Sequence, residues 1–278
     1  MFYLQLKNEL WKLFGKKRTY LGFGAFLIAQ ATIVLVFRYS SASQSMVRQL
    51  EGNGQLAQQF ISGLTIATVM LFPIAYVLLP LYVTLVGGDL VAKEAEDGTL
   101  RMILSRPISR VRLLLVKWFA GCIFSALLVV VLGVLGLGFA SCFFPWGGLF
   151  VFVPGEMFTV LDPGPGLRHY TAAHAMMIIK ASTLLALSFM FGCFNIKPAA
   201  ATILALSVTF LSFVLMQIPF FKDLQPWFFT YHLNVWQNML AEHVPWWRVG
   251  ESLSILLGFN LTFLVIGLTA FQVRDIKS

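Results

Sequence analysis

Charged side chains are scarce in this sequence. Of its 278 residues, 12% are Asp, Glu, Lys or Arg, whereas 58% are hydrophobic. A soluble domain carries about 25% charged residues, so this composition excludes an ordinary water-covered surface. The sequence therefore predicts a protein whose main solvent is lipid, and its length sets a number of membrane spans at about 20 apolar residues each.

Cysteine and histidine are also rare. The three cysteines, Cys122, Cys142 and Cys193, are odd in number and form no CxxC pair, so neither a disulfide framework nor a metal site is expected. His169 and His174 lie five residues apart, which is not the i, i+4 spacing of a helical metal pair, and no HExxH or GxSxG motif is present. These absences argue against a metalloenzyme or a hydrolase, and we expect no catalytic residue in this chain.

The charge that is present is basic overall, with a net charge of +8. In a membrane protein, Lys and Arg accumulate in cytoplasmic loops, so this excess of basic residues indicates which loops lie on the inner side. No nucleic-acid partner is expected. With both termini cytoplasmic and six spans, 14 of the 20 Lys and Arg residues fall on the inner side. The sequence thus predicts a multi-pass protein of the cell (inner) membrane, in contact with membrane lipid.

Six apolar runs define an all-α polytopic membrane protein with one transmembrane domain over residues 1–278. An amphipathic interfacial helix is expected over 1–18, because apolar residues recur there at helical spacing between polar ones. A basic segment precedes the first apolar run, but no small-residue cleavage site follows the run. The run is therefore expected to be a retained span and not a signal peptide. The predicted spans are 20–37, 63–86, 113–139, 172–194, 198–218 and 252–271, and the predicted outer loops are 38–62, 141–171 and 219–251.

The outer loops carry local signals of their own. We expect a short helix near 46–50 with a turn at 52–54, and a turn cluster at 162–166. The β-prone runs 149–153 and 157–161 flank Pro154-Gly155-Glu156, which predicts a hairpin. The aromatic-rich segment 220–250 predicts one or two short re-entrant helices that dip into the outer interface before the sixth span.

Three residues inside the spans are candidates for a substrate pathway. Pro73 and Pro80 each remove a backbone hydrogen bond from the second span and can kink it, although kinks are common in any polytopic bundle. Lys180 places an ammonium inside the fourth span. Two interpretations stay open at this point: it extends to the outer surface, or it faces a polar cavity where it meets an anionic substrate group.

The most charged part of the chain is the stretch 89–117, which lies between two apolar runs. Because charged segments do not rest in lipid, we expect it to lie in water between the second and third spans. Its apolar and charged edges predict a helix on the inner surface over 89–112. Gly98 allows a bend, Pro107 breaks the helix, and Ser109 is a plausible N-cap for the third span.

This stretch resembles the signature of type-2 ABC transporter permeases (the ABC-2 type), the transmembrane subunits of ATP-binding cassette transporters. In that family an acidic pair precedes Gly-Thr-Leu, a Pro-x-Ser-Arg elbow follows, and a Lys begins the third span. Arg106 departs from the pattern, since a small or polar residue is more usual there, and the family's outer hairpin before the last span is matched only by composition. The matching residues are Glu94-Ala-Glu96-Asp97-Gly98-Thr99-Leu100, Leu104-Ser105-Arg106-Pro107-Ile108-Ser109-Arg110, Leu114 and Lys117.

The resemblance implies a permease, expected to be an exporter, with a coupling helix at 89–112 that docks on a separate ATPase. It implies two permease copies, expected to be a homodimer, and two ATPase subunits, which would bind ATP and Mg because the chain has no GxxxxGK[ST] loop. The alternative is a non-transporting membrane scaffold or anchor, which would lack a continuous cavity. The implied coupling residues are Glu94, Glu96, Asp97, Gly98, Thr99, Leu100, Arg101, Pro107, Ser109 and Arg110.

Within that set, the acidic residues are expected to meet basic groups or backbone amides of the ATPase, and Arg101 and Arg110 to meet acidic groups. Since Glu94 and Glu96 are both expected in water, changing them to Ala is predicted to uncouple hydrolysis from transport without affecting folding.

Overall fold

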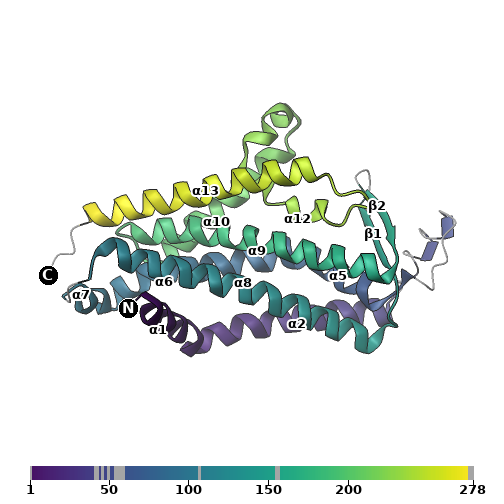
Figure 1. Ribbon diagram of the computed structural model, residues 1–278, viewed down its shortest axis with the longest axis horizontal. Helices are drawn as coiled ribbons and strands as arrows, with labels where there is room; N and C mark the ends of the chain where they lie inside the picture. Colours follow the sequence, from purple (N-terminus) through teal and green to yellow (C-terminus); the bar gives the residue numbers. More distant parts are fainter. Residues whose placement is uncertain are drawn as a thin grey trace.

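Six long helices run along the longest axis of the molecule (Figure 1). The computed structural model describes residues 2–40, 44, 47–48, 51–52, 60–105, 108–153 and 157–274. Within these residues, six helices are long and apolar enough to cross a membrane, which confirms a mostly helical, multi-pass protein. They are α2 (Lys17–Tyr39), the continuous run of α5 (Gly63–Pro73), η1 (Ile74–Leu78) and α6 (Leu79–Glu96), α8 (Arg110–Phe143), α9 (Pro163–Cys193), α10 (Pro198–Gln217) and α13 (Trp246–Val273).

The shorter elements lie at the ends and on one side of these helices. The N-terminal helix α1 (Phe2–Gly15), the short helix α7 (Thr99–Leu104) and the C-terminal end of α13 gather at one end, and the strands β1 (Leu149–Val153) and β2 (Met157–Leu161) lie at the other (Figure 1). Between α10 and α13 come three short helices, η2 (Pro219–Trp227), α11 (Phe229–His232) and α12 (Val235–Asn238). The predicted short helices before the sixth span are therefore present.

The chain is not all-α, because β1 and β2 pair antiparallel, from Leu149 opposite Leu161 to Val153 opposite Met157. The hairpin predicted from the sequence is thus confirmed, while its connecting residues 154–156 lie outside the described part. Aromatic and β-branched residues suit a pleated, half-buried surface, and Leu149 is fully buried against the helices. The short helix expected near 46–50 and the turn at 52–54 fall mostly outside the described residues.

Two predicted boundaries are wrong. Residues 162–166 do not form a turn cluster: α9 begins at Pro163, nine residues before the predicted start at 172. Proline suits the first turn of a helix, because its missing N–H has no intrahelical partner there. The predicted surface helix does not begin at 89, because residues 89–96 belong to α6, which continues the helix of the second span to Glu96.

Helix α9 lies at the centre of the fold. Within its most apolar stretch, 72% of α9 is buried, whereas the buried share is 22% for α10 and for α13. Helix α9 therefore contacts neighbours on all sides, while α10 and α13 keep broad apolar faces on the surface. Its main neighbours are α6, α8, α10 and α13.

Glycines set how closely the helices approach. A Cβ at Gly87 of α6 would lie 2.7 Å from the backbone oxygen of Leu185 on α9, so only glycine fits this contact. Close contact also occurs at glycines of α8. The structure shows it at Gly133, whose added Cβ would lie 2.6 Å from the His174 ring, and at Gly136, but a Cβ at Gly138 would meet nothing within 4 Å.

Candidate functional site

The chain changes direction between α6 and α8, and we call residues 97–105 and 108–109 the elbow. Helix α6 ends at Glu96, and Gly98 adopts φ 73°, a left-handed conformation that glycine adopts at little cost. Helix α7 then starts at Thr99, whose hydroxyl donates to the Glu94 carbonyl oxygen at 3.2 Å. The predicted bend at Gly98 is confirmed, and it points α7 away from the axis of α6.

Helix α7 has one buried and one exposed face. Leu100 is 2% exposed, and Ile103 and Leu104 pack on the same core. On the opposite face, Arg101 is exposed and Met102 is 68% exposed. A six-residue helix that buries one side and presents a large apolar side chain beside a cation on the other is suited to contact another protein.

Two exposed acidic residues directly precede α7 in the chain. The side chains of Glu96 and Asp97 are 41% and 51% exposed, and both pair with Lys93, at 2.7 and 3.1 Å. We call Glu96, Asp97, Arg101 and Met102 the elbow face. It carries both signs of charge around one exposed apolar side chain.

The far end of the elbow is fixed by a helix cap. The Ser109 hydroxyl accepts from the backbone N–H of Arg112 at 3.3 Å, so the predicted N-cap of the third span is confirmed. Such a cap satisfies one of the unpaired amides in the first turn of a helix. Pro107 and Arg106 lie outside the described residues.

Beneath the elbow, four charged side chains from three helices form a closed cluster. The Lys117 Nζ of α8 lies 2.9 Å from Glu9 Oε2 of α1 and 2.8 Å from Glu94 Oε2 of α6. The Lys12 Nζ of α1 lies 2.8 Å from Glu9 Oε1 and 3.2 Å from Glu94 Oε1. We call Glu9, Lys12, Glu94 and Lys117 the four-charge cluster. Its charges sum to zero, and it joins α1, α6 and α8 at one point.

The cluster corrects the expectation for Glu94. Its side chain is only 15% exposed and is paired on both sides, so it does not lie free in water as Glu96 does. The Lys117 side chain is 1% exposed, which means that loss of either partner leaves a buried, unpaired charge. Glu94→Ala is therefore no longer expected to leave folding intact, whereas that expectation stands for Glu96.

Sequence reasoning missed the role of Glu9, which is one of the polar residues of the helix predicted over 1–18. A signal was present: Glu9 lies three residues after Leu6 and four before Leu13, and so shares their face of the helix. Lys117 likewise lies inside an apolar run. A carboxylate on one apolar face and an ammonium on another must each find a partner.

The pKa values of the two α1 residues are set by burial and by the cluster. Burial raises the pKa of Glu9, but the charges and hydrogen bonds of Lys117 and Lys12 outweigh it and hold the pKa below its ordinary value of 4.5. Burial lowers the pKa of Lys12, but the hydrogen bond and charge of Glu9, with that of Glu94, raise it above 10.5. Both shifts favour the charged forms.

Acid is therefore expected to loosen α1. Because the Glu9 pKa is depressed by folding, its stabilisation is fully present above pH 4.5 and is lost as the pH falls through the lower, folded-state value. Hydrogen–deuterium exchange, corrected for intrinsic rates, should show less protection of the α1 amides at pH 3.5 than at pH 6. Amides in the middle of α13 serve as the control and should not change. Equal α1 protection at both pH values would contradict the assignment.

Two arginines near the elbow bind other helix ends. The Arg110 Nη1 donates to the carbonyl oxygens of Phe271, Gln272 and Arg274 at 3.0–3.3 Å, so it caps the C-terminus of α13. The Arg274 guanidinium donates to the Phe194 carbonyl at 3.1 Å and to the Asn195 amide oxygen at 2.8 Å, at the end of α9. Arg110, expected to meet an acidic partner group, is thus already engaged within the chain.

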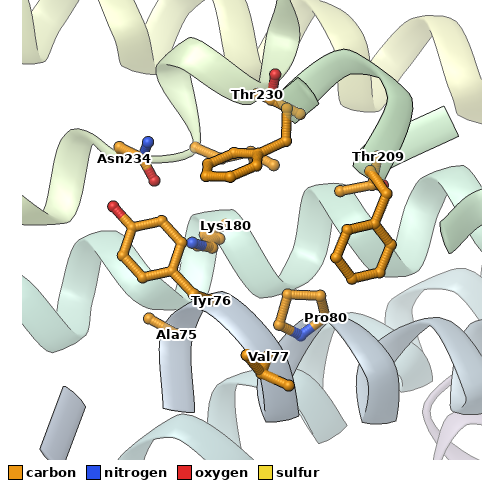
Figure 2. Close-up of a pocket in the computed structure, with 11 residues that line it drawn as sticks. Ala75, Tyr76, Val77, Pro80, Lys180, Thr209, Thr230 and Asn234 are labelled. Atoms are coloured by element: carbon orange, nitrogen blue, oxygen red, sulfur yellow. The ribbon is translucent and has the colours of Figure 1, made fainter. Parts of the chain in front are cut away.

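A second candidate site is a cavity of about 210 Å³ in the side of the helix bundle. Its walls come from η1 and α6 of the second span, from α9, from α10 of the fifth span, and from the segment after η2 (Figure 2). The side chains that line it include Tyr76, Val77, Pro80, Lys180, Thr209, Phe210, Phe213, Thr230 and Asn234.

Lys180 points into this cavity from α9 (Figure 2). It is 3% exposed, and it lies 17 residues after the start of α9 at Pro163, which is about 25 Å along the axis. Within the described chain the side chain is thus buried at the cavity and does not extend to the surface of the bundle. The cavity differs from the polar one that was expected, since aromatic and aliphatic side chains make up most of its wall.

The two prolines of the second span take different positions. They bracket the π-helical turn η1, Ile74–Leu78, an irregularity that is frequent at functional sites. Pro80 is buried and lines the cavity. Pro73 is exposed and is not among the lining residues, so the structure brings only Pro80 together with Lys180.

Comparison with known proteins gives one match. A model of the ABC-2 family of transporter proteins matches residues 7–225, from within α1 to within η2. The match thus covers the elbow, the four-charge cluster and eight of the eleven residues that line the cavity, whereas Thr230, Leu233 and Asn234 lie beyond it. No curated protein matches the chain.

Proposed function

The chain belongs to the ABC-2 family of transporter membrane proteins, and we propose that it is the permease subunit of an ABC exporter. As a member of this family it is a non-catalytic transmembrane subunit, and membership implies partnership with an ABC ATPase. In the proposed complex the ATPase docks on the elbow face and holds the ATP and Mg. The membrane orientation places both termini and the elbow in the cytoplasm, with the hairpin of β1 and β2 outside.

The observation that carries this proposal is the two-sided α7. Its buried face holds the helix against the core, while Met102 and Arg101 project away from it. A force on the exposed face therefore acts on α6 and α8 directly, because α7 is joined to both by short connections. The four-charge cluster extends this connection to α1.

A permease homodimer is the second part of the proposal. Helix α10 keeps a broad apolar face, with Ile203 and Leu211 each 61% exposed, and Val77 and Leu81 of the second span are about half exposed. Of these side chains, Val77 lines the cavity, so a second copy placed against this face would set two cavities side by side.

The cavity also favours transport over the alternative of a non-transporting scaffold. A scaffold has no use for a cavity around an irregular helix turn and a buried ammonium, whereas a transporter requires a binding site between its spans. The short helices α11 and α12 lie alongside α13 and α9, and in the proposed topology they dip in from the outer interface.

The docking surface can be tested by changing the charge and the polarity of the elbow face. The double variant Arg101→Glu and Met102→Asp should lower the amount of ATPase that co-purifies from native membranes by at least ten-fold, because it replaces the apolar contact and inverts a charge. The partner is identified by mass spectrometry as a protein with a phosphate-binding loop.

Arg168→Glu, at an exposed site near the opposite end of the molecule, provides the matched control and should recover ATPase normally. Size-exclusion chromatography is used to check that all variants are folded. Undiminished ATPase in the double variant would rule out docking on the elbow face.

A further inference from the structure

The cavity beside α9 contains a charge that the chain does not neutralise. Among the residues that the structure describes, no carboxylate forms an ion pair with Lys180, and its ammonium lies 5.0 Å from the centroid of the Tyr76 ring. A cation–π contact offsets only part of the cost of removing an ammonium from water. An unpaired cation inside a span is therefore expected to serve a ligand or an ion pathway.

The polar groups around Lys180 include a second available donor. Thr209 donates its hydroxyl to the Ala205 carbonyl at 2.8 Å, and Thr230 is bonded to Ser212 and Met216. By contrast, no hydrogen bond of the Asn234 side chain is found within the described chain, and its amide lies at the cavity beside Tyr76, with the oxygen on the cavity side (Figure 2). A half-turn of the amide group presents its N–H groups to the cavity instead. An ammonium and an amide N–H are both donors, which suits an acceptor with negative charge.

The rest of the wall is apolar. Val77 and Pro80 lie on the side away from Asn234 (Figure 2), and Phe210 lines the cavity as well. Val77 and Phe210 are each 52% exposed, so the cavity opens beside them on the surface of the bundle. Ligand pockets commonly measure about 300–1,000 Å³, and this cavity is smaller at about 210 Å³. The cavity has room for a charged group and a few carbons. The rest of a longer apolar ligand would extend out of the cavity between α6 and α10.

A second, polar cavity adjoins the first. It measures about 440 Å³ and shares Tyr76, Phe213 and Asn234 with it. Gln237 lines this second cavity and donates to the Tyr76 hydroxyl at 2.8 Å. Arg248 and Glu251, at the start of α13, line it as well. The buried ammonium of Lys180 thus lies between the polar second cavity and the apolar opening of the first.

We propose that this site binds amphipathic anions, with Lys180 as the counter-ion. The ligand carries one carboxylate or phosphate at Lys180 and Asn234, a hydrocarbon or aromatic body against Val77, Pro80 and Phe210, and any further polar part in the adjoining cavity. The inference rests on the proposed transport function in one respect: it identifies the chemical class of the transported molecule, or of a bilayer lipid that occupies its path.

Matched probes test the charge requirement on the wild-type protein. The permease is reconstituted in nanodiscs of zwitterionic phosphatidylcholine, and its thermal stability is followed against dodecanoate, dodecyl phosphate, dodecanol and dodecylamine. The two anions should bind at least ten-fold more tightly than the alcohol of equal chain length, and the amine should bind most weakly. Equal affinity for dodecanoate and dodecanol would overturn the proposal without any variant.

Substitution at the cation assigns the effect to Lys180. Lys180→Met keeps a long flexible side chain but removes the charge, and it should abolish the preference for anions. Lys180→Arg should retain it, and Lys222→Met, the same change at a lysine of η2 outside the cavity, should behave as wild type. Retained anion preference in Lys180→Met would contradict the assignment, and Asn234→Leu, with an expected several-fold loss, gives a second test if Lys180→Met does not fold.

Two sources of the anion are distinguished by what the protein retains. Native mass spectrometry of permease purified from native membranes should detect a bound anionic phospholipid in wild type and not in Lys180→Met if the ligand is a bilayer lipid. If it is a transported molecule, ATP-dependent export of labelled dodecanoate should depend on Lys180. Absence of both results overturns the inference.

The inference and the proposed function can fail separately. Anion selectivity without any co-purifying ATPase would support the anion site and contradict the proposed transport function. A docked ATPase with no anion selectivity would support the proposed transport function and contradict the anion site.

Discussion

Lys117→Met is expected to leave little folded protein. The substitution removes the buried ammonium that holds Glu9 and Glu94, at 2.9 and 2.8 Å, and leaves two shielded carboxylates sharing Lys12 alone. Breaking a buried ion pair by removing one partner costs about 3–5 kcal/mol, which is a large part of the stability of a protein. The recovery of monodisperse protein and its melting temperature in detergent measure the loss.

Two further variants show that the loss arises from charge imbalance. Lys117→Met combined with Glu9→Gln restores neutrality, because Lys12 and Glu94 still pair, and it should recover much of the stability. Lys93→Met removes a lysine that makes two ion pairs of similar length on the surface, and it should have a far smaller effect. If Lys117→Met melts as wild type does, the four-charge cluster does not hold α1 in place.

Gly87→Val is expected to separate α6 from α9. Its Cβ would lie 2.7 Å from a backbone oxygen of Leu185, so relief requires movement of a whole helix and not of one side chain. Overpacking costs about 1–3 kcal/mol where side chains can adjust, and we expect at least the upper end of this range. The amount of folded protein after purification, followed by size exclusion, measures the effect.

The control for this change is the same substitution in open space. A Cβ at Gly258, in the middle of α13, would meet nothing within 4 Å, so Gly258→Val should be tolerated. Equal yields of the two valine variants would show that the contact between α6 and α9 is not close packed.

The sequence was most informative where one local signal decides the structure. The six spans follow from runs of apolar residues, the hairpin from two β-prone runs around a Pro-Gly turn, and the elbow from Gly98 and Ser109. In each case the cause lies within a few residues of its effect, such as the left-handed φ of 73° at Gly98 or the Ser109 cap of α8.

Prediction failed where the cause is distant. Whether Glu94 lies in water depends on Lys117 and on Glu9, which is 85 residues away in the chain. The depth of Lys180 depends on where α9 begins, and Pro163 reads equally well as part of a turn or as the first residue of a helix. Gly166 allows α9 to pack against the hairpin, because an added Cβ there would lie 2.7 Å from the side chain of Leu149, and no local pattern contains that contact.

These features form one mechanical connection in the proposed complex. The ATPase acts on the exposed side of α7, Leu100 and the Ser109 cap pass the displacement to α6 and α8, and the four-charge cluster makes α1 follow. At the C-terminal end of α13, Arg110 and Arg274 connect the same region to α13 and α9. Helix α9 carries Lys180, so movement at the elbow reaches the cavity through helices that pack directly on one another.

The most direct test of this account is a photo-crosslinking measurement in native membranes. A photoreactive amino acid at position 102, on the exposed face of α7, is predicted to capture a protein with a phosphate-binding loop. The same group at position 152, where Phe152 is 40% exposed on β1 at the opposite end, is predicted to capture none. Capture of the ATPase from position 152 and not from position 102 would place the partner on the other face of the membrane and contradict the account.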